Sequence, residues 1–189
     1  MHIIDIIKLI AYFLLLVVCA YTDYKNGKIY NKNLLRFLLA YVIIYCIEYI
    51  FTILTKKENL TLLNAKLIKN LSGFLIAFVI GFIFYILGVF KGGDAKLIAM
   101  VGLTTMGKED LFIRLATILI VAGVVALYVM IKNKIFVKRF RRLFLYIKGM
   151  ILTRSFEKYT TDDDNIKFPF AVYILLGEII SFLNILLRG

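Results

Sequence analysis

Residues 71–97 read LSGFLIAFVIGFIFYILGVFKGGDAKL. Residues 71–90 carry no charge, and an apolar run of that length can cross a lipid bilayer. The run ends in a polar stretch that holds Lys91, two glycines, Asp94 and Lys96. Charge that faces lipid is costly, and ionisable groups at membrane depth often serve a function. The stretch therefore predicts a membrane protein and makes Asp94 the first candidate for chemistry.

The composition supports a membrane location. Of the 189 residues, 62% are hydrophobic and only one is a proline, which is unusual for a soluble domain. The 24 basic and 12 acidic residues leave a formal net charge of +12. Because the basic residues lie between apolar runs, this charge favours membrane orientation and contact with anionic lipid. We expect membrane lipids as partners and no nucleic acid.

The sequence offers few metal ligands. Cys19 and Cys46 lie inside apolar segments, no Cys-x-x-Cys pair is present, and the only histidine is His2. These features argue against a zinc site or a disulfide framework, so we expect no metal and no cofactor. The N-terminal segment lacks a basic start and a small-residue cleavage site, and we interpret residues 3–22 as a retained span.

Six apolar segments predict an all-α membrane protein, a polytopic bundle of six transmembrane helices that forms one integral domain over residues 1–189. The segments cover about 3–22, 34–54, 71–90, 95–106, 113–131 and 168–187. The fourth is short, because twelve residues of helix extend about 18 Å, less than the ~30 Å hydrocarbon core. It is either a span or a re-entrant segment.

The distribution of charge favours a span. The loop after the first segment carries Lys25, Lys28, Lys32 and Arg36, and the loop 132–167 carries ten basic residues. Both loops are cytoplasmic by the positive-inside bias only if 95–106 crosses, and both termini then lie outside. Four lysines in residues 55–70 contradict the bias, and the leucine pattern there suggests a short interfacial helix.

This topology brings two acids to one face. Asp23 follows the first predicted span, and two spans separate it from Asp94, so both acids lie at the cytoplasmic boundary. Two carboxylates held close together can share a proton, because both cannot ionise cheaply. One then acts as general base for a water molecule while its protonated partner polarises a carbonyl. Such a pair can hydrolyse a peptide bond as aspartic proteases do.

Three stretches resemble motifs of one family. Residues 92–97, Gly-Gly-Asp-Ala-Lys-Leu, resemble the Gly-x-Gly-Asp-x-Lys-Leu motif of type IV prepilin peptidases, which include the archaeal preflagellin peptidases. Asp23 with Ile29 and Asn31 is similar to their first motif, an Asp followed by Ile-Pro-Asn. Residues 167–170, with Gly177 beyond them, are similar to the start of their last helix. The chain departs at two positions, where Lys91 replaces a glycine and Tyr30 replaces a proline.

The resemblance implies a membrane-embedded aspartic endopeptidase of the cell's inner membrane. It would remove the short basic leader from type IV prepilin-like or archaellin-like precursors at the cytoplasmic face. Asp23 and Asp94 match the catalytic pair, and Gly92, Gly93 and Lys96 mark where the substrate strand would approach. Larger members that also methylate the new N-terminus carry two Cys-x-x-Cys pairs. This chain has none, so it resembles the short, peptidase-only members.

Two alternatives stay open at this point. One is a presenilin-like intramembrane protease, although such enzymes carry their first acid in a Tyr-Asp pair inside a helix, and Thr22-Asp23 ends a predicted span. The other is a small transporter or channel that uses Lys8, Glu48 and Glu178 as a charge path. Lys8 and Glu48 each lie about fourteen residues, roughly 21 Å, from the cytoplasmic end of their spans, which predicts that they pair. For Glu178 we expect a buried hydrogen bond rather than a third catalytic acid.

Overall fold

A computed structural model of the chain describes residues 3–55, 60–87, 89–105, 107–133 and 169–188, with a few isolated positions between 137 and 152. The described ranges contain six α-helices and no strand. The helices are α1 (Ile3–Asn26), α2 (Asn31–Thr55), α3 (Leu60–Ile86), α4 (Gly92–Leu103), α5 (Lys108–Lys132) and α7 (Phe170–Arg188). Most of the basic loop 132–167 lies outside the described residues.

Four of the described helices can cross a membrane by length and composition. These are α1, α2, α3 and α5, while α4 has 12 residues and the apolar part of α7 covers Phe170–Asn184. The prediction of an all-helical, multi-pass membrane protein is confirmed. The lengths of the helices do not by themselves support six spans, because α4 and α7 are shorter than the other four.

Two boundaries differ from the sequence prediction. Residues 60–70 are not a separate interfacial helix but the first turns of α3, because no glycine or proline interrupts the chain there. Asp23 does not follow the first helix but lies in its last turn, because α1 continues to Asn26. Gly27 then ends the helix with a φ of 65°, the left-handed conformation that glycine adopts at helix C-termini.

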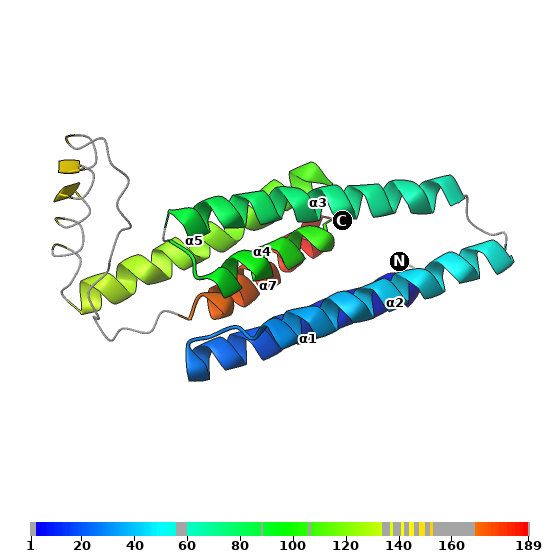
Figure 1. Ribbon diagram of the computed structural model, residues 1–189, viewed down its shortest axis with the longest axis horizontal. Helices are drawn as coiled ribbons and strands as arrows, with labels where there is room; N and C mark the ends of the chain where they lie inside the picture. The colour runs from blue at the N-terminus through cyan, green and yellow to red at the C-terminus, as the bar shows by residue number, and fades with distance from the viewer. Residues whose placement is uncertain are drawn as a thin grey trace.

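The short helix α4 is the centre of the bundle. Nine of its 12 residues are buried, and Figure 1 shows it between α3 and the antiparallel pair α1–α2. Small residues let α3 approach it closely: a Cβ added at Gly81 would lie 2.8 Å from the Ala95 carbonyl oxygen, and Gly73 packs against Gly102 in the same way. Small residues at such crossings favour helix association in lipid, where no hydrophobic effect drives it.

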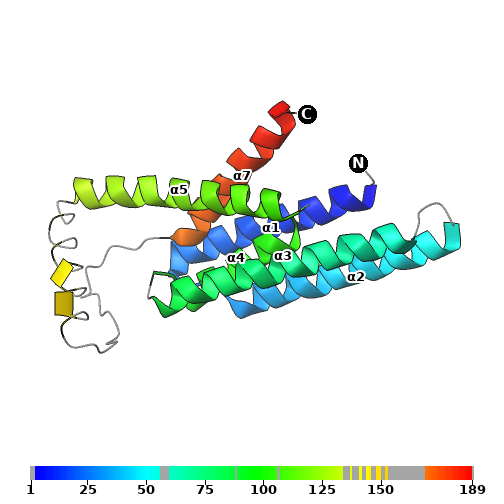
Figure 2. The same cartoon turned by 90° about the horizontal axis from the view of Figure 1, so that it is seen from above.

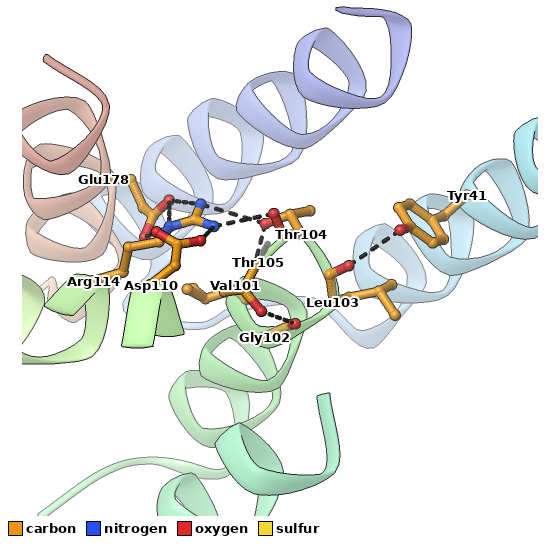
Figure 3. Close-up of polar contacts among 9 residues, drawn as sticks. All are labelled: Tyr41, Val101, Gly102, Leu103, Thr104, Thr105, Asp110, Arg114 and Glu178. Atoms are coloured by element: carbon orange, nitrogen blue, oxygen red, sulfur yellow. Dashed lines mark hydrogen bonds and ion pairs between the residues drawn. The ribbon is translucent and has the colours of Figure 1, made fainter. Parts of the chain in front are cut away.

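The C-terminal end of α4 is buried, and side chains from α2 and α5 satisfy its carbonyl groups. The Tyr41 hydroxyl donates to the Leu103 oxygen at 3.1 Å, and Arg114 donates from its Nη1 to the Thr104 oxygen at 3.2 Å. Glu178 on α7 accepts hydrogen bonds from the Arg114 guanidinium and forms an ion pair with it (Figure 3). A helix that ends inside a bilayer needs such donors, because no water reaches its last carbonyls.

The predicted pairing of Lys8 with Glu48 is confirmed. The Lys8 ammonium donates to a carboxylate oxygen of Glu48, and the two residues are 6% and 5% exposed. Lys66 also approaches Glu48, with its Nζ 3.5 Å from Oε1. The contact joins α1 to α2, and Lys66 adds α3 to it.

One end of the bundle gathers the segments that carry the candidate motifs. Helix α1 ends there, and α4 and α7 begin there, whereas the N and C labels lie toward the opposite end (Figures 1 and 2). Helix α7 is held against α5 by a tight contact, since a Cβ added at Gly177 would lie 2.7 Å from the Ile118 Cα. The fold thus brings Asp23, Asp94 and the start of α7 to the same region.

Candidate active site

A small cavity of about 170 Å³ lies where α1 ends and α4 begins. Asp23 and Asp94 both line it and are 3% and 5% exposed. The other lining residues come from the turn after α1 and from the start of α4: Gly27, Lys28, Ile29, Lys91 and Gly93. Two carboxylates that lie 71 positions apart in sequence therefore line one cavity.

The first turn of α4 holds Asp94. Lys91 precedes the helix in an extended conformation, and its backbone N–H donates to Asp94 Oδ2 at 3.0 Å. Burial, together with the nearby charge of Asp23, raises the pKa of Asp94 to about 6 despite this hydrogen bond. Asp94 precedes the predicted crossing segment 95–106. The site therefore favours the protonated form of this carboxyl group below about pH 6, a higher pH than for an ordinary aspartate.

The last turn of α1 and the first turn of α7 hold Asp23. Its Oδ2 accepts a hydrogen bond from the backbone N–H of Ala171 at 3.0 Å. The first amides of a helix have no partner inside the helix, and the helix N-terminus carries partial positive charge. This contact places a backbone donor and the partial positive charge of α7 beside the Asp23 carboxyl group. The two acids thus have different surroundings.

Contacts between the two motif-like stretches fix their relative position. The Lys91 ammonium donates to the Gly27 carbonyl at 3.3 Å. A Cβ added at Gly93 would lie 2.9 Å from the Ile29 Cβ, whereas one added at Gly92 would meet only the Tyr85 ring at 3.7 Å. Gly93 therefore allows Ile29 to pack close to the start of α4, beside Asp94. The position of a side chain at Gly92 is open except for the Tyr85 ring.

Lys96 also links the two stretches. Its ammonium donates to Asn31 Oδ1 at 3.1 Å, on the exposed side of the site. The structure thus brings Lys96 to the asparagine of the first motif-like stretch rather than to either carboxylate. Aromatic rings join the ends of α3 and α7 to the residue before Lys91: the Phe90 ring lies 4.6 Å from that of Phe170 and 5.0 Å from that of Phe84, measured between centroids.

The three charges of the transport hypothesis have structural partners. Glu48 is paired with Lys8, and Glu178 with Arg114, so these groups neutralise one another inside the bundle. The expectation that Glu178 makes a buried hydrogen bond is confirmed, and its partner is a guanidinium. In the described part of the chain, no three His, Cys, Asp or Glu side chains gather where they could hold a metal ion.

Comparison with known families decides the identity of the chain. A family model described as the type IV leader peptidase family matches residues 10–132, well over half of the sequence. The chain belongs to this family. It is therefore a peptidase and a multi-pass membrane protein, and the resemblance seen in the sequence is confirmed. Among curated proteins and solved structures, no significant match is found.

Two residues at this candidate site of the leader peptidase were not predicted from the sequence. Gly27 follows a long apolar helix, a position where glycine often ends helices, and this signal could have located it. Ala171 acts through its backbone N–H, so no side-chain pattern could have revealed it. Helix α7 lies beyond the residues that the family model matches, yet it contributes directly to the surroundings of Asp23.

Proposed function

We propose that this leader peptidase is an aspartic endopeptidase whose catalytic pair is Asp23 and Asp94. The observation that carries the proposal is that both buried carboxylates line one cavity. Helix α7 donates the Ala171 N–H to Asp23, which suits the role of base, and burial raises the pKa of Asp94, which suits the role of acid. An acid and a base side by side are what this hydrolysis requires.

The mechanism follows from these two environments. Asp23 takes a proton from a water molecule, and the water oxygen attacks the carbonyl carbon of the scissile peptide bond. Asp94 donates its proton to the carbonyl oxygen, which gives a neutral tetrahedral gem-diol. Asp23, now protonated, transfers its proton to the departing amide nitrogen while Asp94 takes one back from a hydroxyl group. The C–N bond breaks, and the pair returns to its starting state.

The substrate class follows from the family and the position of the site. We assign to the enzyme a prepilin-like or archaellin-like precursor with a short basic leader and a following apolar helix. Gly92, Gly93 and Lys96 lie beside the cavity or next to its lining, where an extended substrate segment can approach Asp94. The sequence holds two cysteines and no Cys-x-x-Cys pair, and we propose cleavage without N-methylation.

The proposal includes six crossings of the inner membrane. Helices α1, α2, α3 and α5 cross by length, and α4 and α7 complete the set with shorter apolar segments. Donors from α2 and α5 at the C-terminal end of α4 support a helix that ends inside the bilayer. Lys25, Lys28 and Lys32 then lie on the cytoplasmic side, together with the catalytic pair.

Cleavage by reconstituted enzyme tests the proposal. The substrate is a full-length precursor with a basic leader and an apolar helix, and mass spectrometry detects the shortened product. Asp23→Asn and Asp94→Asn should each reduce the rate at least about a thousandfold, and the double variant should be hardly worse, because the pair acts as a unit. Glu109→Gln, a change of an exposed carboxylate at the start of α5, should cleave normally. A folded Asp23→Asn enzyme with near wild-type activity would refute the aspartic mechanism.

A further inference from the structure

A second and larger cavity lies at the opposite end of α4. Its volume is about 450 Å³, and it borders Thr104 and Thr105, about 15 Å of helix from Asp94. It shares no lining residue with the cavity of the two aspartates. Cavities of this size commonly hold small ligands. Its position follows from the short α4, because a longer helix would continue through this space.

The lining combines an apolar slot with charged side chains. Apolar groups come from α1, α3 and α7, and they include Leu9, Phe13, Leu62 and Phe182. Lys66 and Lys69 on α3 also line the cavity, and Lys69 is exposed while Lys66 is partly buried. A ligand that fills this space must therefore be apolar over most of its length and polar at one end.

Each carboxylate of the lining is paired with a cation, whereas one cation of the lining has no carboxylate partner. Lys66 pairs with Asp5, at 2.5 Å from Nζ to Oδ1, and Arg114 pairs with Glu178 and with Asp110. Lys8 pairs with Glu48. Among the described residues, Lys69 forms no ion pair with any carboxylate. The cavity thus presents one uncompensated ammonium group beside its apolar slot.

A second observation concerns the same lysines. Residues 55–70 carry four lysines, and under the proposed topology they lie outside, where the positive-inside bias disfavours them. A lysine that contacts an anionic lipid headgroup is stabilised relative to a lysine in water. A lipid partner therefore explains why basic residues are found at this end of α3.

We propose that this cavity binds a phospholipid with an anionic headgroup. The phosphate lies against the Lys69 ammonium with Lys66 beside it, and one acyl chain enters the slot between Phe13, Leu62 and Phe182. The uncompensated charge selects an anionic over a zwitterionic headgroup, and the apolar slot selects a lipid over a free phosphate ion. The proposal goes beyond peptide cleavage, and it rests on the proposed topology only through the argument from the lysines of residues 55–70.

Native mass spectrometry of the full chain tests this proposal. The protein is equilibrated in mixed micelles of phosphatidylglycerol and phosphatidylcholine in equal amounts. One phosphatidylglycerol molecule should remain bound in preference to phosphatidylcholine. Lys69→Gln should weaken the retention of phosphatidylglycerol about fivefold, which corresponds to the contribution of one lysine near an anionic surface. Ala65→Phe, which adds a ring to the cavity lining, should abolish retention.

Two controls separate this site from surface binding and from ion binding. Lys132→Gln removes an exposed lysine at the other end of α5 and should leave retention unchanged. Inorganic phosphate at millimolar concentration should not displace the lipid. Equal retention of the two lipids, equal losses in the Lys69 and Lys132 variants, or displacement by phosphate would each overturn the proposal. A dimer without bound lipid in the same spectra would instead assign the cavity to a second copy. None of these results bears on the aspartate pair, because the cavities share no residue.

Discussion

The Lys8–Glu48 pair gives a quantitative test of the packing of this bundle. Glu48 has two cations, Lys8 and Lys66, whereas the only carboxylate that pairs with Lys8 in the described residues is Glu48. Removing one partner of a buried ion pair typically costs about 3–5 kcal/mol, because the other charge is left without compensation. The two single substitutions should therefore differ in their effects.

The structure sets the order of the effects. Glu48→Gln leaves Lys8 buried beside the rings of Tyr41 and Tyr45, at 5.6 and 5.2 Å from their centroids, which compensate only part of its charge. We expect a loss of about 3 kcal/mol in the free energy of unfolding. Lys8→Met leaves Glu48 with Lys66 at 3.5 Å, and about 1–2 kcal/mol should be lost. The double variant removes both charges and should resemble Lys8→Met, which implies a coupling of about 3 kcal/mol, the full loss expected for Glu48→Gln.

Unfolding in mixed micelles, titrated with a denaturing detergent and followed by circular dichroism, measures these differences. Asp5→Asn serves as a control, since its pair with Lys66 is partly exposed, and it should cost less than about 1 kcal/mol. If Glu48→Gln is no more harmful than Lys8→Met, or if the losses in the double variant are additive, the pair does not provide the stabilisation described here.

Three other predictions concern the site and the topology. Gly93→Ala places a Cβ 2.9 Å from the Ile29 Cβ, so it should destabilise the protein by about 1–3 kcal/mol and slow cleavage. Gly92→Ala places a Cβ 3.7 Å from the Tyr85 ring, an ordinary contact, and should change neither stability nor cleavage. Burial raises the pKa of Asp94 from 3.8 to about 6, so between these pH values the folded state retains a proton that the unfolded state loses. The free energy of unfolding should therefore fall between about pH 4 and 6 and then level off. Cleavage should decline above about pH 6, where Asp94 loses its proton. Asp94→Asn should remove this dependence of stability on pH, and an unchanged profile would contradict the assignment. A single cysteine at position 27 should be protected from an impermeant thiol reagent in intact cells, and one at 108 should react; labelling in the reverse sense would invert the proposed topology.

The sequence predicted the fold class, the helices and the Lys8–Glu48 pair from simple physical signals. Apolar runs located the helices, and equal depth in two neighbouring spans predicted the pair. The boundaries were less accurate, because hydropathy marks where a helix enters lipid and not where its hydrogen bonds end. Asp23 and residues 60–70 are polar or mixed in character but remain helical, since nothing in the chain interrupts the backbone before Gly27 or within α3.

The candidate site was predictable only in part. The motif-like stretches identified both aspartates, and the count of spans placed them on one face. The differences between their environments depend on contacts across the bundle, such as the Ala171 N–H at Asp23 and the Lys91 N–H at Asp94. The role of Arg114 at the end of α4 was not predicted, because it depends on how α5 and α7 pack.

Helix α7 takes part in contacts near both ends of α4. Near its start it donates the Ala171 N–H to Asp23, and further along it is fixed to α5 by the Glu178–Arg114 pair and by the contact of Gly177 with Ile118. Arg114 also supports the buried end of α4, whose first turn holds Asp94. One guanidinium thus helps to position α4 and α7, which contribute to the surroundings of Asp94 and Asp23, although it contacts neither carboxylate in the described structure. The buried Arg114–Glu178 pair therefore has a structural explanation, and it does not require that the protein transport ions.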